Sequence, residues 1–190
     1  LPLSPFYSNA TQEGIYQHYK YLRELSELPI MLYNVPGRTG SNMSPETTCR
    51  LAHDFKNIIA TKEASGSFDQ FNQIMRDKPE DFLLISGDDP IALPMISIGA
   101  VGVISVLGNA LPKQLSDMVR LCLKGDFTSA LPAHLSLLEI TRLLFAEGNP
   151  AGVKAALKQL GICDDVVRLP LVKASEGLNT LIATQLKQLA

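Results

Sequence analysis

The sequence lacks the features that mark nucleic-acid-binding and membrane proteins. It has no long basic run, and its net charge is −2 with a pI near 5.9. We therefore expect no nucleic-acid partner and no anionic membrane partner. No apolar stretch is long enough to span a bilayer, and the opening Leu-Pro-Leu-Ser-Pro has no basic signal-peptide region. With 46% hydrophobic and 19% charged residues, the composition is that of a soluble globular protein, and we expect it in the cytoplasm.

Metal and redox motifs are also missing. The three cysteines, Cys49, Cys122 and Cys163, are odd in number and far apart. They match no zinc or redox spacing, so we expect small buried or semi-buried thiols in a reducing compartment. The sequence also lacks an initiator Met, and Leu1 to Ser4 reads as the last residues of a strand. We therefore expect a fragment of a longer protein.

What the sequence does contain is a strict alternation of short apolar strands and helices. We expect strands over 29–33, 58–62, 82–86 and 101–106, with helices over 11–27, 44–55, 67–77, 90–98 and 110–124. This pattern is typical of a parallel sheet built from βα units. No Gly-x-Gly-x-x-Gly follows any of these strands, which weakens a dinucleotide-binding interpretation.

The even spacing favours a (β/α)₈ barrel over a doubly wound sheet. Because only one strand end and four full strands are present, we predict an α/β protein comprising the second half of such a barrel, from the end of strand 4 through helix 8. This partial barrel is expected over 1–125. Helical patterns alone follow, over 127–147, 150–160 and 175–189, so we predict a C-terminal helical domain over 126–190.

Lys62 ends the strand that begins at Ile58 and precedes a loop of Ser65, Gly66 and Ser67. A lysine at a strand end is most often an exit to water. At the apolar rim of a sheet, however, desolvation favours the neutral amine. Neutral amines attack carbonyl carbons, so Lys62 is a candidate nucleophile.

Barrel chemistry lies at the carboxyl ends of the strands, where the sequence places Tyr7, Tyr33, Arg38, Lys62 and Gly87. An imine between lysine and a ketone withdraws electrons, while tyrosine hydroxyls move protons and arginine binds a carboxylate. Taken singly, each tyrosine is also consistent with an amphipathic surface residue and Arg38 with a solvated charge. The combination favours Schiff-base chemistry.

Two motifs carry a resemblance to the dihydrodipicolinate synthase family of pyruvate-dependent class I aldolases. The loop Tyr33-Asn34-Val35-Pro36-Gly37-Arg38-Thr39-Gly40 resembles the family's Tyr-Asn-x-Pro-x-Arg-Thr-Gly motif. Ile59-Ala60-Thr61-Lys62-Glu63-Ala64 is similar to its Schiff-base lysine strand. Further similar segments follow the family's order, so the resemblance covers essentially all 190 residues.

The resemblance implies a catalytic role for three residues. Lys62 would form an imine with pyruvate, and Tyr33 would donate and accept protons during its formation. Tyr7 resembles the second tyrosine of the family's proton relay, which reaches into the neighbouring subunit's site. The resemblance also implies a homo-oligomer built as a dimer of dimers. No metal or organic cofactor is implied, because the lysine itself is the electron sink.

The resemblance also assigns the substrate-binding residues. Arg38 would hold the carboxylate of aspartate semialdehyde, backbone at Ile104 would contact pyruvate, and Gly87 would line the pocket. Asn109 is assigned to the same pocket. The implied reaction condenses pyruvate with L-aspartate 4-semialdehyde to 4-hydroxy-tetrahydrodipicolinate, in lysine and diaminopimelate biosynthesis.

Alternatives stay open within and outside this chemistry. N-acetylneuraminate lyase and 2-keto-3-deoxy sugar acid aldolases share the lysine and tyrosine but usually lack arginine at the position of Arg38. The family's Gly-Thr-Thr-Gly-Glu-like segment is absent from these 190 residues. The chain by itself is therefore expected to have little activity, or to be a non-catalytic half-barrel.

Overall fold

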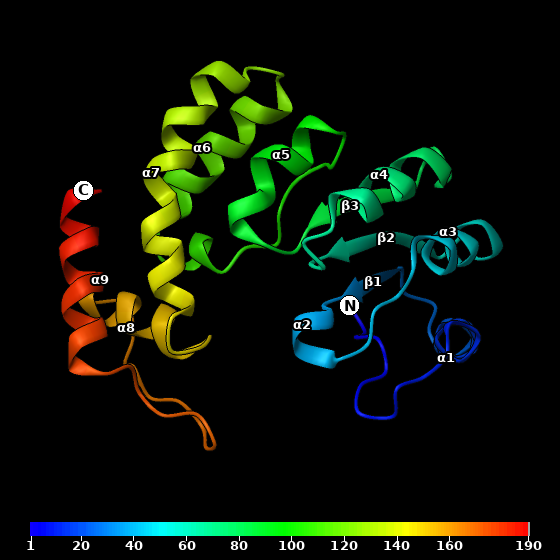
Figure 1. Ribbon diagram of the computed structural model, residues 1–190, viewed down its shortest axis with the longest axis horizontal. Helices are drawn as coiled ribbons and strands as arrows, with labels where there is room; N and C mark the ends of the chain where they lie inside the picture. The colour runs from blue at the N-terminus through cyan, green and yellow to red at the C-terminus, as the bar shows by residue number, and fades with distance from the viewer. Residues whose placement is uncertain (190) are drawn as a thin grey trace. The chain divides into compact units, whose positions relative to one another are not determined.

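The computed structural model describes residues 1–189, which fall into two compact units (Figure 1). The first unit is Leu1–Ile104, and the second comprises the described residues from Ser105 onward. The division between 125 and 126 expected from the sequence stays a prediction.

The first unit is built on a parallel sheet whose strands follow one another in chain order. Its strands are β1 (Ile30–Asn34), β2 (Ile58–Glu63) and β3 (Leu83–Ser86), and β2 pairs with both neighbours. Single parallel bridges extend this order on both sides, from Leu3 to Tyr33 and from Ser86 to Val103. The first unit is thus an α/β structure with no reversal of strand order.

The two faces of this sheet differ sharply in burial. Toward the carboxyl ends of the strands one face is buried, and its side chains there are Leu32, Asn34, Thr61, Glu63, Leu84 and Ser86, whereas Ile59 on the same face is 40% exposed. On the opposite face, Tyr33, Lys62 and Ile85 are only half-buried. Because successive side chains in a strand alternate between faces, each reactive residue has a buried neighbour behind it.

Helices in the first unit begin where the sequence provides capping residues. The main helices are α1 (Gln12–Glu24), α3 (Pro45–Asp54), α4 (Phe68–Asp77) and α5 (Ala92–Ser97). The side chains of Thr11, Ser44 and Ser67 each accept a backbone hydrogen bond at the start of a helix, which satisfies amides that lack an intrahelical partner. Apolar residues of α1, α3 and the strands form the core, including Ile15, Tyr19, Leu32, Leu51 and Ile58.

Several expected boundaries were wrong. The expected strand over 101–106 contains a single bridge residue, Val103, because the chain turns into the helical region at Val106 and begins the 3₁₀ helix η2 (Leu107–Asn109). The expected loop after β1 contains a short helix, α2 (Pro36–Thr39). The expected helix over 90–98 is divided into η1 (Asp89–Ile91) and α5.

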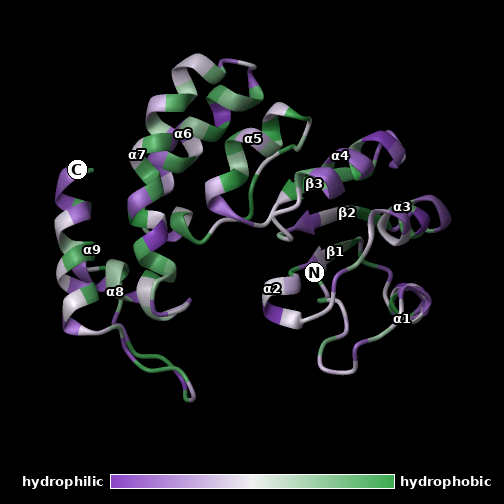
Figure 2. Cartoon of the chain, viewed as in Figure 1, coloured by the Kyte–Doolittle hydropathy of each residue, from purple (hydrophilic) through white to green (hydrophobic). Residues whose placement is uncertain are grey.

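The second unit is helical. Its helices are η2, α6 (Pro112–Leu123), α7 (Phe127–Phe145), α8 (Ala151–Gln159) and α9 (Glu176–Gln188). Hydrophobic and hydrophilic residues are interspersed along α6 and α7 (Figure 2), as expected for helices packed on one side. Over residues 1–189, every helix is too short or too polar to cross a membrane.

We predict that Gly152→Ala destabilises the second unit. A Cβ at Gly152 would fall on the backbone of Leu144, with Cα of Leu144 only 2.8 Å away, so α8 and α7 would have to separate. Overpacking of this kind typically costs about 1–3 kcal/mol of unfolding free energy, measurable by urea denaturation. The matched control is Gly177→Ala in α9, where the nearest atom is 3.9 Å away, and equal destabilisation by both variants would contradict the prediction.

Candidate functional site

Strand pairing brings Tyr33 and Lys62 together. These two residues are partners in the parallel register of β1 and β2, and their side chains lie on the half-buried face. The Nζ of Lys62 is 4.1 Å from the centroid of the Tyr33 ring, which is a cation–π distance for a protonated amine. The amine of Lys62, the candidate nucleophile, therefore lies over the ring of Tyr33, the candidate proton carrier.

Gly87 packs against the stem of Lys62. It follows β3, and its backbone N–H donates to the carbonyl of Glu63 at 2.8 Å. A Cβ at this position would lie 2.8 Å from the Cβ of Ala64 and 3.2 Å from Cε of Lys62. Only glycine leaves room for this approach, so Gly87 forms a wall beside the lysine side chain.

Ile104 and Asn109 have different relations to this site. The backbone N–H of Ile104 donates to Ser86 at 2.9 Å, which places Ile104 beside the end of β3 in the first unit. Asn109 belongs to the second unit, where its exposed side chain donates to the carbonyl of Val106 at 3.0 Å. The assignment of Asn109 to substrate binding stays a prediction.

Arg38 lies on α2, the short helix that follows β1. Its side chain is exposed, and among residues 1–189 it takes part in none of the ion pairs. A guanidinium with this freedom can bind a planar carboxylate in bidentate fashion.

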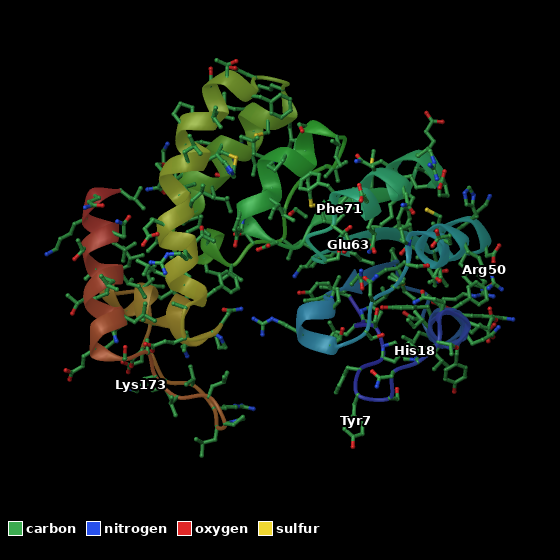
Figure 3. The ribbon with its side chains drawn as sticks, viewed as in Figure 1. Tyr7, His18, Arg50, Glu63, Phe71 and Lys173 are labelled. Atoms are coloured by element: carbon green, nitrogen blue, oxygen red, sulfur yellow. The ribbon has the colours of Figure 1, made fainter. Side chains whose placement is uncertain are left out.

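Tyr7 does not join Tyr33 and Lys62. Its side chain is 94% exposed, and its backbone is left-handed with φ of 67°. Figure 3 shows the ring pointing away from the rest of its unit. The Tyr7 side chain is therefore open to solvent. Its role as second tyrosine of a proton relay, which the resemblance implies, stays a prediction.

The acidic pair after β3 forms no part of the lysine contact. Asp88 occupies the position before η1, but its side chain makes no capping hydrogen bond. Burial, and then the charge of Asp89, raise the pKa of Asp88.

A buried polar cluster lies behind Tyr33 and Lys62, and the sequence interpretation missed it. Asn34 and Glu63, each the next residue in its strand, are register partners. The amide of Asn34 donates to both carboxylate oxygens of Glu63 at 3.1 Å, while Ser65 N–H donates at 2.8 Å and Gln70 Nε2 at 3.1 Å. Polar residues directly after Tyr33 and Lys62, at the ends of buried strands, were the available signal.

Gln70 connects the start of α4 to the Glu63 carboxylate. Its backbone N–H is capped by Ser67, but its side-chain amide turns inward to Glu63 and to the carbonyl of Met43 at 3.2 Å. Ser67 and Gln70 therefore form only one half of a capping box. Burial outweighs the hydrogen bonds from Asn34, Ser65 and Gln70 and raises the pKa of Glu63.

The cysteines differ in exposure. Cys49 and Cys122 are buried as expected, and burial raises the pKa of the Cys49 thiol to about 11. Cys163 is exposed, contrary to expectation, because the segment after α8 is open to solvent. Within the described residues, no group of three or more His, Cys, Asp or Glu side chains is arranged to hold a metal ion.

The first unit belongs to the class of parallel α/β proteins, and it places a lysine against a tyrosine ring at adjoining strand ends. Comparison with known proteins identifies the family within this class. The Dihydrodipicolinate synthetase family matches residues 1–189. The chain therefore belongs to this family.

Individual relatives agree with this assignment. The chain is 58% identical over 168 residues to the 4-hydroxy-tetrahydrodipicolinate synthase of Phocaeicola vulgatus, covering 88% of this chain and 57% of that protein. It is 51% identical over 190 residues to the synthase of Parabacteroides distasonis, covering 100% of this chain and 64% of the relative. The crystal structure of dihydrodipicolinate synthase from Thermotoga maritima matches with a TM-score of 0.95 and 41% identity, covering 98% of this chain and 64% of that one. The chain thus spans less than two thirds of the length of these relatives.

We predict that Glu63 makes stability fall as pH rises. Its folded-state pKa lies above the ordinary value of 4.5, so its contribution to stability is fully present below that pH and is lost as pH rises through the raised pKa. Glu63→Gln should remove this part of the pH dependence when unfolding free energy is measured by urea denaturation across a pH series. An unchanged pH profile in the variant would contradict the prediction.

Proposed function

We propose that the protein carrying this chain condenses pyruvate with L-aspartate 4-semialdehyde to give 4-hydroxy-tetrahydrodipicolinate, in lysine and diaminopimelate biosynthesis. The observation that carries the proposal is the contact of Lys62 Nζ with the Tyr33 ring at 4.1 Å, in a chain that belongs to the Dihydrodipicolinate synthetase family.

In this proposal, the neutral amine of Lys62 attacks C2 of pyruvate, and loss of one water gives an iminium. The iminium withdraws electrons, so C3 loses a proton and becomes an enamine carbon. That carbon attacks the aldehyde of the second substrate. The amino group of the second substrate then adds to C2, which closes the ring and releases the amine of Lys62.

Proton transfers in this sequence are assigned to tyrosine. Departure of the carbinolamine oxygen as water needs a proton, and Tyr33 is the hydroxyl whose ring already contacts the amine. A positioned proton donor typically contributes about 10²–10⁴-fold in rate. The exposed Tyr7 is proposed to act with Tyr33 only after contact with a neighbouring copy. The lysine is the electron sink, so the proposal invokes no metal or organic cofactor.

The second substrate is assigned through Arg38. Its exposed guanidinium, close in sequence to Tyr33, suits the carboxylate of aspartate semialdehyde. The second substrates of N-acetylneuraminate lyase and sugar acid aldolases are polyols without a carboxylate for this contact, so Arg38 favours the synthase reaction over these alternatives.

We further propose that the first unit is part of a (β/α)₈ barrel. The order Leu3, β1, β2, β3 and Val103, all parallel and all in sequence, supports a barrel, since doubly wound sheets reverse strand order. The half-buried face with Tyr33 and Lys62 would then be the barrel interior. The 190 residues alone would turn over slowly or not at all, and the cytoplasmic enzyme would act as a homo-oligomer, with a dimer of dimers as the expected form.

Trapping of the imine tests the nucleophile. With pyruvate and borohydride, the full-length protein should gain one reduced pyruvyl adduct on Lys62, read by intact mass and peptide mapping. Lys62→Arg should give none, and Tyr33→Phe, which keeps the ring, should slow trapping by about 10²–10⁴-fold because the proton donor is lost. Lys56→Arg is the matched control. An adduct on another lysine, or none in the unaltered protein, would refute the proposal.

Arg38 is tested through the second substrate. Arg38→Ala should raise KM for aspartate semialdehyde by about 10- to 100-fold, since a hydrogen bond to a charged group contributes about 1.5–3 kcal/mol. Pyruvate trapping should stay unchanged. Arg120→Ala, which removes exposed contacts with Asp117 and Ser116, is the control. An unaltered KM in Arg38→Ala would remove the basis for choosing this substrate.

A further inference from the structure

We propose that Glu63 is a positioning residue for Lys62, acting through the buried cluster formed by Asn34, Ser65 and Gln70. This inference rests on the proposed Schiff-base function and deepens it. It assigns a task to a carboxylate that takes no part in the chemistry described above.

The geometry begins with two adjoining dipeptides. Tyr33-Asn34 ends β1 and Lys62-Glu63 ends β2, and the register pairs Tyr33 with Lys62 and Asn34 with Glu63. Because side chains alternate along a strand, the reactive pair lies on one face and the polar pair on the other. Whatever fixes Asn34 against Glu63 therefore fixes the alignment of Tyr33 against Lys62.

The Glu63 carboxylate accepts hydrogen bonds from uncharged donors. Asn34 Nδ2 bridges both oxygens at 3.1 Å, Ser65 N–H donates to Oε1 at 2.8 Å and Gln70 Nε2 donates to Oε2 at 3.1 Å. These donors come from β1, from the loop after β2 and from the first turn of α4, and none of them titrates. The carboxylate thus joins β1, the loop after β2 and α4 from its place on β2 next to Lys62 in the sequence, and Glu63 is labelled in Figure 3.

The donors are themselves held. The Oδ1 of Asn34 accepts from the N–H of Met43 at 3.0 Å, and its Nδ2 donates to Asn42 at 2.8 Å. The Oε1 of Gln70 accepts from Nδ2 of Asn42 at 3.1 Å, and its Nε2 donates to the carbonyl of Met43. The cluster therefore has little freedom to adapt, and loss of one member is transmitted to its neighbours.

The burial of this carboxylate is not explained by stability. Among residues 1–189, none of the ion pairs includes Glu63, so the carboxyl group is buried without a cation, and its ionisation opposes folding. Its neighbour toward the N-terminus is Lys62, and its carbonyl accepts the N–H of Gly87, the wall beside that lysine. The proposal explains the carboxyl group of Glu63 at this position by its effect on Lys62, whose side chain it holds in one position.

The test is the rate of pyruvate trapping per folded molecule in the full-length protein. Glu63→Gln replaces an acceptor oxygen by an NH₂ group that faces existing donors, so Lys62 should shift. A displacement near 1 Å can lower a rate by about 10²-fold, and we expect a loss of this order. The pyruvate concentration for half-maximal trapping should change little. Glu80→Gln, an exposed site in the same unit, is the matched control and should trap at the unaltered rate.

A second variant keeps the inference testable should Glu63→Gln fail to fold. Gln70→Ala removes one donor from outside the sheet and leaves Glu63 in place. Its trapping rate should fall less than that of Glu63→Gln. In a profile of trapping rate against pH, the fall in rate on the acid side should move to higher pH, because the carboxylate has lost one stabilising hydrogen bond. A purely structural role would lower the melting temperature without shifting this pH profile.

The outcomes separate the two proposals. Absence of trapping in the unaltered protein overturns the proposed function and the inference with it. Normal trapping in the unaltered protein, together with unaltered rates per folded molecule and unaltered pH profiles in the variants, overturns the inference alone.

Discussion

The pairing of β1 with β2 at their carboxyl ends is the interaction on which the rest of the site depends. One register sets Tyr33 beside Lys62 and Asn34 beside Glu63. A slip of one residue would move each side chain to the other face of the sheet. It would bury the amine and expose the carboxylate. The polar cluster opposes such a slip, because its hydrogen bonds form in one register only.

The two faces of the sheet divide the tasks of stability and chemistry. The buried face carries Leu32, Thr61 and Leu84, all fully removed from water, together with the cluster around Glu63. The other face leaves Lys62 and Tyr33 half-buried, where an amine can meet a substrate. A reactive side chain must be accessible to its substrate. The side chains that position it are better buried, because hydrogen bonds in the protein interior compete least with water.

Much of the first unit could be predicted from its residues. Apolar runs ending at Tyr33 and Lys62 gave parallel strands, and Ser44 and Ser67 gave helix starts. The motif around Arg38 gave the family, which the comparisons confirmed. The strand expected over 101–106 failed because apolar composition does not reveal where a chain leaves the sheet. The exposure of the Tyr7 ring, which is 94% exposed, depends on the conformation of its loop and could not be read from its place after a strand.

The sequence by itself determined the order of strands and helices, the residue types available for chemistry and the family, because these depend on local pattern and on motifs. Only the tertiary structure decided that Gln70 turns inward rather than capping its helix, that Gly87 lies against Lys62, and that Glu63 is buried among donors. These facts depend on register and packing between segments far apart in the chain. A hydrogen bond across 29 residues, such as that from Asn34 to Glu63, leaves no periodic trace in the sequence.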